Sequence, residues 1–160
     1  MQDYRLEPAR LSDTARLAAM SQALVEAGLR PRWDAQRIGW HVRDAESVVL
    51  TARSDRGIAG FAVMCFGDDA AHLNLLAVEP AHRRRGIARR LLTWLEESAL
   101  TAGTYLIGLE RRASNVAAQE FYRALGYRET ARVPGYYQGI EAALRMERDV
   151  RVSRPTAARS

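Results

Sequence analysis

The first quarter of the chain predicts one strand followed by two helices. Tyr4–Glu7 has the composition of a short strand, and Pro8 closes it. The next segment places apolar residues at the spacing of one helical face, at Leu17, Met20, Leu24 and Val25. Gly28 is suited to end that helix, and Asp34 is suited to cap a second short helix that extends through Val42.

The middle of the chain changes to strand patterning. Ser47–Ala52 and Ile58–Phe66 are rich in β-forming residues, and the turn residues between them predict an antiparallel hairpin. His72–Val78 is largely apolar, which is typical of a central strand covered on both faces. Simple alternation along this strand would place three side chains on one face, namely His72, Asn74 and Leu76.

Helical periodicity then returns twice. An apolar stripe predicts a long helix from Ile87 to about Gly103, and Tyr105–Leu109 is the next strand, followed directly by Glu110. Because a helix connects this strand to the previous one, the two strands are expected to run parallel. Asn115–Leu125 predicts a second crossover helix.

Two strands complete the predicted fold. They are Tyr127–Val133 and Ile140–Asp149, joined by a link over Pro134–Gly139. The order β-α-α-β-β-β-α-β-α-β-β predicts an α/β (α+β) protein with a mixed central sheet of six to seven strands flanked by about four helices. We expect residues 1–150 to form a single domain and residues 151–160 to be a flexible tail with few anchors.

An arginine-rich turn between the central strand and the long helix is the strongest chemical signal. It reads Arg83-Arg84-Arg85-Gly86-Ile87-Ala88. Free amide N–H groups at a helix start, the positive end of the helix dipole and guanidinium groups together favour binding of a polyphosphate. Arginines at a helix N-terminus oppose the dipole, so their placement is costly unless an anion binds there. The nucleotide P-loop and the three-glycine dinucleotide pattern are both absent.

The spacing in this turn resembles R/Q-x-x-G-x-G/A, the pyrophosphate loop of the GNAT-superfamily N-acetyltransferases. Arg83, Gly86 and Ala88 occupy the defining positions. The resemblance runs from about Tyr4 to Asp149, and the predicted order of elements is that of the GNAT fold. Within the superfamily the chain is most similar to the RimI-like branch, which acetylates ribosomal-protein alanine and other N-terminal amines.

The resemblance implies acetyl-CoA as the co-substrate. Its pyrophosphate would meet the backbone of Arg84, Arg85, Gly86, Ile87, Ala88 and Arg89. Its pantetheine arm would pair with the central-strand backbone at Leu76, Ala77 and Val78. The side chain of Asn115 matches a residue that contacts the same arm, although Asn115 is also placed to act as a plain helix N-cap.

The same resemblance implies that Glu110 is the general base and Tyr122 the general acid. A carboxylate of ordinary pKa, about 4.3, is a weak base toward an ammonium, so Glu110 would act through water and need help from desolvation. Tyr122 would be protonated at neutral pH, as a donor to a thiolate must be. Other roles stay open: Glu110 as an ion-pair partner of a neighbouring arginine, Tyr122 as a core residue, and His72 as a rival base.

The segment near the C-terminus resembles the Y-Y-x-x-x-E/D-A run of N-terminal acetyltransferases. Tyr136, Tyr137 and Glu141 occupy its fixed positions, which implies that they line the pocket for the acceptor amine. The link here is shorter than in many relatives. A hairpin that simply carries β-forming aromatic residues is the structural alternative.

Composition limits the partners. All 24 basic residues are arginine and the net charge is +5, which favours polyanionic ligands. The arginines are spread along the chain with one dense cluster, Arg83–Arg90, which suits a compact phosphate ligand better than a nucleic acid. The single cysteine, Cys65, excludes an internal disulfide and is expected to be a buried core residue. His41 and His82 show no metal-ligand spacing, so we expect no metal.

The sequence therefore predicts a one-domain N-acetyltransferase that moves an acetyl group to a primary amine by direct attack in a ternary complex. The expected acceptor is a protein or peptide α-amine. A small-molecule amine acceptor and a non-catalytic CoA- or RNA-binding module are the alternatives. No apolar run approaches the ~20 residues of a membrane span, and the N-terminus lacks the apolar segment of a signal peptide, so we expect no membrane partner and a cytoplasmic location. Monomer and homodimer both stay open.

Overall fold

The computed structural model describes residues 3–154, which form one seven-stranded sheet, four α-helices and two short 3₁₀ helices. The strands are β1 (Arg5–Pro8), β2 (Ser47–Ser54), β3 (Gly57–Phe66), β4 (Ala70–Val78), β5 (Leu106–Arg112), β6 (Arg128–Tyr137) and β7 (Glu141–Asp149). The helices are α1 (Thr14–Leu24), α2 (Ala35–Arg43), α3 (Ile87–Ala102) and α4 (Val116–Ala124). The predicted α/β class and order of elements are confirmed.

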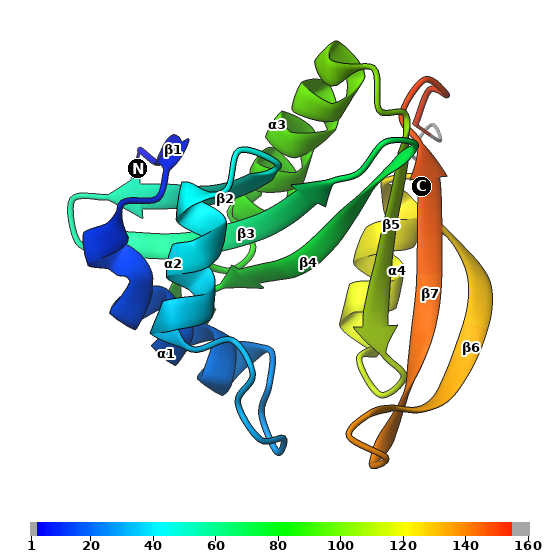
Figure 1. The fold of residues 1–160 in the computed structure, drawn as a ribbon, viewed down its shortest axis with the longest axis horizontal. Coiled ribbons are helices and arrows are strands. Elements are labelled where there is room, and N and C mark those ends of the chain that lie inside the picture. Colours follow the sequence, from blue (N-terminus) through cyan, green and yellow to red (C-terminus); the bar gives the residue numbers. More distant parts are fainter. Residues whose placement is uncertain (1–2, 155–160) are drawn as a thin grey trace.

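The sheet has the strand order β1-β2-β3-β4-β5-β7-β6 (Figure 1). All neighbouring strands are antiparallel except β4 and β5, which are parallel and connected by α3. This confirms the direction that the sequence predicted for the pair. The parallel pair lies in the middle of the sheet, so it divides an N-terminal half, β1–β4, from a C-terminal half, β5–β7.

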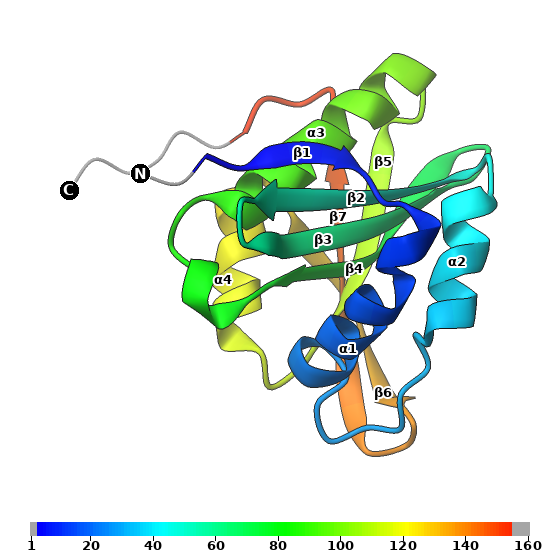
Figure 2. The ribbon, with the colours of Figure 1, turned by 90° about the vertical axis from the view of Figure 1, so that its left-hand side faces the viewer.

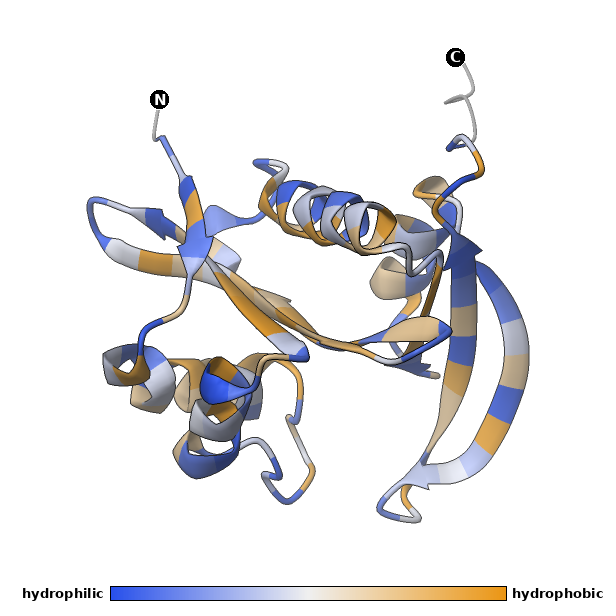
Figure 3. Ribbon diagram, turned by 45° about the horizontal axis from the view of Figure 1, so that its top comes forward, coloured by the Kyte–Doolittle hydropathy of each residue, from blue (hydrophilic) through white to orange (hydrophobic). Residues whose placement is uncertain are grey.

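Two layers of helices cover the sheet (Figures 2 and 3). The helices α1 and α2 pack on one face through a cluster that includes Leu17, Met20, Ile38, Phe61, Val63 and Leu75. The helices α3 and α4 pack on the other face through a larger cluster that includes Met64, Leu73, Leu91, Leu95, Ile107 and Tyr122. In both layers the apolar stripe of each helix faces the sheet, as an amphipathic helix on a sheet requires.

A β-bulge at Asn74 interrupts β4. Val63 of β3 pairs with Leu75 and the next residue, Met64, pairs with Leu73, so Asn74 is an extra residue with no partner across the ladder. Leu73 therefore packs with the α3–α4 cluster, and Leu75 packs with the α1–α2 cluster. The prediction of uninterrupted alternation along this strand was wrong for this reason.

The bulge also separates residues that alternation had placed together. His72 and Asn74 line a cavity on the α1–α2 side of the sheet, whereas Leu76 packs against the α3–α4 cluster. The expectation that β4 is covered on both faces also fails at its polar positions, because the side chain of His72 is 42% exposed.

The two parallel strands separate beyond the bulge. Their pairing begins at Ala70 opposite Leu106 and ends at Leu73 opposite Leu109, after which β4 and β5 diverge (Figure 1). The strand β5 nevertheless continues to Arg112, because β7 pairs with it along its other edge. Glu110 is therefore the first residue of β5 beyond the paired region, and it lies within the strand rather than at the strand end that the sequence predicted.

The last hairpin is also more extended than predicted. The link expected over Pro134–Gly139 is mostly strand, since β6 continues to Tyr137 with an irregularity in its pairing after Val133. Because β6 is the edge of the sheet, Pro134 needs no ladder partner for the amide it lacks. The turn itself is short and places Gln138 at a φ of 57°.

The segment after β7 turns back over α3. Arg154 donates to the Thr93 hydroxyl at 2.8 Å and also binds the Glu96 carboxylate. Within the predicted tail, residues 151–154 are thus in contact with the domain, and residues 155–160 lie outside the described residues. No helix within residues 3–154 is long and apolar enough to cross a membrane.

Candidate active site

Three cavities follow one another along β4. The first, of about 270 Å³, lies between the α1–α2 loop and the β6–β7 hairpin. The second, of about 490 Å³, lies where β4 and β5 diverge, and it shares Leu73, Asn74 and Glu110 with the first. The third, of about 320 Å³, lies between the arginine-rich turn and the end of α4. One strand thus connects an amphiphilic pocket, an open cleft and a basic pocket.

The arginine-rich turn forms the third cavity, and its backbone conformation explains the sequence pattern. Gly86 is the N-cap of α3 with a φ of 74°, a left-handed conformation that glycine adopts without strain. Arg84 is also left-handed, with a φ of 62°. The N–H of Arg90 donates to the Gly86 carbonyl at 3.0 Å, and the amides of residues 87–89 precede this first helical bond. They form the free donor cluster that a helix start offers to an anion.

Not all predicted loop residues point into this cavity. Val78, Arg84, Gly86, Ile87, Ala88 and Arg89 line it. The Arg85 guanidinium instead donates to the Tyr4 hydroxyl at 3.2 Å, and that hydroxyl also contacts His82 Nδ1 at 2.8 Å. Arg85 therefore holds the turn against the N-terminal segment.

The middle cleft contains two of the residues expected near a pantetheine arm. Leu76 and Asn115 line it, whereas Ala77 packs into the α1–α2 cluster outside its lining and Val78 lines the third cavity. Asn115 caps α4, because its Oδ1 accepts from the Ala118 amide at 3.0 Å. Asn74 adds a polar atom that the sequence did not single out: its Oδ1 is buried and has no hydrogen-bond partner within residues 3–154. A buried acceptor of this kind is costly unless a ligand donates to it.

Tyr122 lies on the inner face of α4 and lines the same cleft. Its ring packs edge-on against Phe121 and Tyr127, so the structural role that the sequence left open is real. Burial raises the pKa of the Tyr122 hydroxyl far above its usual range, with a smaller contribution from Tyr137. The hydroxyl is therefore fully protonated at neutral pH, as a proton donor requires.

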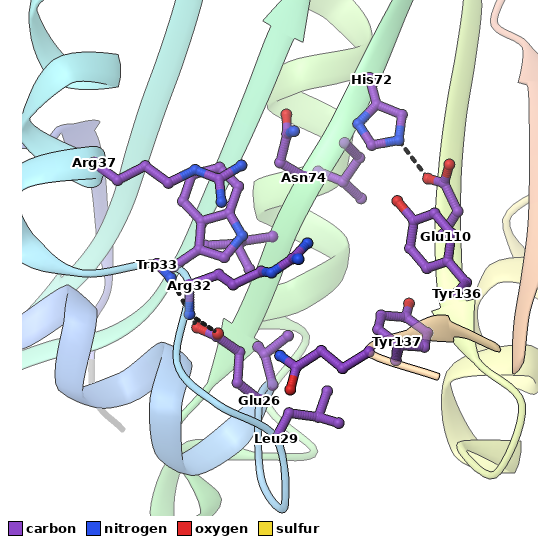
Figure 4. Close-up of a pocket in the computed structure, with 14 residues that line it drawn as sticks. Glu26, Leu29, Arg32, Trp33, Arg37, His72, Asn74, Glu110, Tyr136 and Tyr137 are labelled. Carbon is purple, nitrogen blue, oxygen red and sulfur yellow. Dashed lines mark hydrogen bonds and ion pairs between the residues drawn. The ribbon is translucent and has the colours of Figure 1, made fainter. Parts of the chain in front are cut away.

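Glu110 and His72, the two rival bases, form a single pair (Figure 4). His72 Nε2 is hydrogen-bonded to Glu110 Oε2, and Arg145 Nε donates to Glu110 Oε1 at 3.3 Å. The hydrogen bond from His72 lowers the pKa of Glu110, and this outweighs the opposing effect of burial. Burial raises the pKa of Glu110, as the predicted role of general base requires, but the imidazole stabilises the carboxylate more strongly.

The paired tyrosines lie on the C-terminal side of the first cavity. Tyr136 and Tyr137 both line it, and burial raises the pKa of both hydroxyls. Glu141 lies outside the cavity linings that hold these tyrosines. Its carboxylate accepts from the amide and hydroxyl of Ser114 at 2.9 and 2.6 Å and pairs with Arg112 at 2.8 Å. These contacts lower its pKa to about 2 and connect the last hairpin to the end of β5.

The opposite side of the first cavity comes from the α1–α2 loop, which sequence reasoning treated only as a link. Glu26 is 7% exposed and organises this loop, because its carboxylate accepts from the Ser21 hydroxyl at 2.7 Å and from the Arg32 and Trp33 amides. Gln138 then joins the loop to the β6–β7 turn by two hydrogen bonds with the Arg30 backbone, at 2.8 and 3.0 Å. No local pattern signals the contacts of Gln138, since their partners are 108 positions apart in sequence.

The remaining histidine and the cysteine form a separate cluster. His41 is 9% exposed between Trp33 and Trp40, and its Nδ1 contacts the Ser47 hydroxyl at 2.9 Å. The Cys65 sulfur lies 3.5 Å from the same nitrogen, and burial raises the pKa of the thiol, which keeps it protonated. Within residues 3–154, no three histidine, cysteine or acidic side chains are grouped to hold a metal ion.

A mixed sheet whose central parallel pair diverges, with a glycine turn at the start of the crossover helix, is the architecture of an acyltransferase. The chain belongs to the acetyltransferase (GNAT) family, whose sequence model matches residues 15–127. This confirms the family resemblance and the predicted enzyme class, an N-acetyltransferase with acetyl-CoA as donor.

Individual relatives agree. The chain is 39% identical over 100 residues to the [ribosomal protein bS18]-alanine N-acetyltransferase of Salmonella typhimurium, covering 61% of this chain and 68% of that protein. It is 39% identical over 66 residues to the catalytic subunit of the N-terminal acetyltransferase B complex of Schizosaccharomyces pombe, covering 41% of this chain and 37% of that subunit. The crystal structure of the ribosomal-protein-S18-alanine N-acetyltransferase from Escherichia coli shares the fold, with a TM-score of 0.80 over 98% of this chain and 99% of that chain at 24% identity.

Proposed function

We propose that this protein transfers the acetyl group of acetyl-CoA to the N-terminal α-amine of a protein or peptide. The observation that carries the proposal is the continuous path along β4, from a basic pocket through an open cleft to a pocket that contains a carboxylate–imidazole pair and two tyrosines. The names of the relatives, which include N-terminal acetyltransferases, support the same choice of acceptor.

The basic pocket would hold the donor. In this proposal the amides of residues 87–89 bind the pyrophosphate, and the guanidinium groups of Arg84 and Arg89, which line the pocket, add charge. The exposed edge of β4 beyond Leu73 and the unpaired Oδ1 of Asn74 offer hydrogen bonds to an amide-containing arm. The thioester is then fixed beside Tyr122, which supplies the positional advantage of a bound reactant.

The reaction proceeds by direct attack. The neutral amine nitrogen attacks the thioester carbonyl carbon, the C–S bond breaks, and the amine proton passes to the Glu110–His72 pair, directly or through water. Tyr122 donates its hydroxyl proton to the departing sulfur and recovers a proton from solvent. Because burial raises the pKa of Tyr122, complete transfer is uphill, and a strong hydrogen bond to the developing thiolate is its main contribution.

Two other functions, both open from the sequence, fit the structure less well. A small-molecule amine fits a cavity of about 270 Å³ but leaves the rim that Gln138 bridges without a role. A non-catalytic CoA- or RNA-binding module would have no use for a carboxylate–imidazole pair whose carboxylate lines the same cleft as a buried tyrosine. The cytoplasmic location, the oligomeric state and the single-domain organisation stay predictions from the sequence.

A peptide panel tests the proposal. Purified protein and acetyl-CoA are incubated with two sets of peptides. The first set has a free α-amine and no lysine. The second set has the same sequences with a formylated α-amine and one added lysine, so that its only amine is the ε-amine. Release of the CoA thiol and an added acetyl mass are expected only for the free α-amine. The enzyme contains no lysine, so it contributes no ε-amine background. Acetylation of the lysine peptides alone, or of small amines alone, would contradict the proposal, and donor binding without any turnover would favour the non-catalytic module.

A further inference from the structure

The carboxylates and the arginines that line the first cavity differ in whether they have partners. Of the two carboxylates, Glu110 is bound by His72 and Arg145, and Glu26 is bound by backbone amides and Ser21. The two arginines that line the cavity, Arg32 and Arg37, form no ion pair within residues 3–154. The cavity therefore offers free positive charge and no free carboxylate.

Both arginines are directed at the acceptor space. Figure 4 shows Arg32 of the α1–α2 loop and Arg37 of α2 extending toward the side that carries His72, Glu110 and Tyr136. Both also act electrostatically on the Tyr136 hydroxyl, where they oppose the rise in its pKa. An acceptor whose amine reaches Glu110 through this cavity therefore shares it with both guanidinium groups and this tyrosine.

The side chain of Arg37 and the backbone of Arg32 are also held in place. The Arg37 guanidinium stacks on Trp33, with its Cζ 3.8 Å from the ring centroid, a cation–π contact that limits its motion. The backbone of Arg32 is fixed by the buried Glu26 carboxylate, and the loop is joined to the β6–β7 turn through Gln138. Pre-organised guanidinium groups bind a carboxylate with less loss of side-chain entropy, and their planar fork matches its two oxygens.

We propose that Arg32 and Arg37 select acceptor peptides that carry an aspartate or glutamate in the second or third position. The inference rests on the proposed function and deepens it, because it names the class of N-terminus that the site prefers. Consecutive residues of an extended peptide are about 3.3 Å apart, so these positions lie near the guanidinium groups when the α-amine is at Glu110. Because both arginines are exposed to solvent, the preference is expected to be moderate and to weaken with salt.

The test compares peptides that differ only by Glu or Gln at position 2 or 3. We expect kcat/KM to be about tenfold higher for the Glu peptide at low salt, corresponding to two moderate charge contacts. In a double variant, Arg32→Gln with Arg37→Gln, the ratio should fall to about one, and in Arg32→Glu it should shift in favour of peptides with Arg at the same position. The matched control is Arg43→Gln, an exposed arginine of α2 outside the cavity, which removes the same charge and should keep the preference.

The outcomes separate the two proposals. Equal rates for the Glu and Gln peptides in the unmodified enzyme, or a preference that survives in the double variant, would overturn the role of the arginines and leave α-amine acetylation intact. Failure to acetylate any peptide would overturn the proposed function, and this inference with it. Unchanged thermal unfolding of the variants would exclude a loss of structure as the cause.

Discussion

The two ends of the cleft are built in different ways. The donor end is a continuous stretch of chain, in which Gly86 and the amides of residues 87–89 lie within a single turn. The acceptor end is assembled from β4, β5, the α1–α2 loop and the β6–β7 hairpin, which contribute His72, Glu110, Arg32 and Tyr136. The turn proposed to bind the donor is thus encoded locally, whereas the groups proposed for proton transfer and acceptor choice are brought together by tertiary contacts.

The largest effect is expected at the donor end, for the substitution Gly86→Glu. It adds a carboxylate, and it places a side chain at a φ of 74°, where only glycine is unstrained. We expect acetyl-CoA binding to become undetectable by calorimetry. The control is Gly103→Glu at the other end of α3, where φ is 80° and a Cβ also meets no atom within 4 Å, so the strain and charge are matched. Equal donor affinity in the two variants would show that the turn does not bind the donor.

The next largest effect tests whether Tyr122 takes part in the reaction or only packs in the core. Tyr122→Phe keeps the packed ring and removes only the hydroxyl, so kcat should fall by roughly 10²–10⁴ while donor affinity changes little. Tyr105→Phe, at an exposed tyrosine outside the three cavities, is the matched control. A Tyr122→Phe enzyme with full turnover would assign this residue to the core alone.

The acceptor end is tested through its paired groups. Glu110→Gln should lower kcat/KM most near neutral pH, by about 100-fold, with partial recovery at high pH, where the amine loses its proton unaided. His72→Ala removes the main cause of the lowered pKa of Glu110. The carboxylate then protonates at a higher pH, so the acid limb of the kcat/KM profile should move upward while activity above that limb is kept. Loss of activity at every pH in His72→Ala, with activity retained in Glu110→Gln, would make His72 the base.

The smallest expected effect concerns the contacts that connect the β6–β7 hairpin of the acceptor end to the end of β5. The contacts of Glu141 with Ser114 and Arg112 lower its pKa to about 2 in the folded protein, below its pKa in the unfolded chain. They therefore stabilise the fold fully at pH values above the unfolded-chain pKa, and this stabilisation is lost as the pH falls toward the folded-state pKa. Glu141→Gln should therefore lower the free energy of unfolding by about 1 kcal/mol at neutral pH. The difference from the unmodified protein should disappear as the pH falls toward 2. A difference that is constant with pH in denaturant titrations would show that the charge of Glu141 is not what connects the hairpin.

The difference between a local turn and a pocket assembled from distant segments also explains which features could be predicted from the sequence. The order of elements, the parallel pair and the arginine-rich turn follow from local periodicity and spacing, and they were predicted. The pairing of His72 with Glu110 was missed because the two residues are 38 positions apart and meet only when β4 and β5 lie side by side. Glu26 and Arg32 were missed because a polar loop carries no periodic signal. Arg37 was missed because the periodicity of α2 identifies its buried residues and not an exposed one that lines a cavity. The placement of Leu76 was wrong because a single extra residue in β4 leaves no trace in the apolar pattern.

That extra residue has a consequence for how the protein tolerates insertions and deletions. Strand interiors rarely absorb changes of length, whereas here one residue of a central strand stands outside the β3 ladder. A chain that lacked only Asn74 would pair β3 with β4 without interruption, with His72 still opposite Cys65 and Leu75 still opposite Val63. It would retain the arginine-rich turn, Glu110, Tyr122 and both pocket tyrosines, and it would lose the unpartnered acceptor of the cleft. A one-residue deletion at this point of β4 would therefore keep the faces of the sheet and remove a single polar group from the cleft.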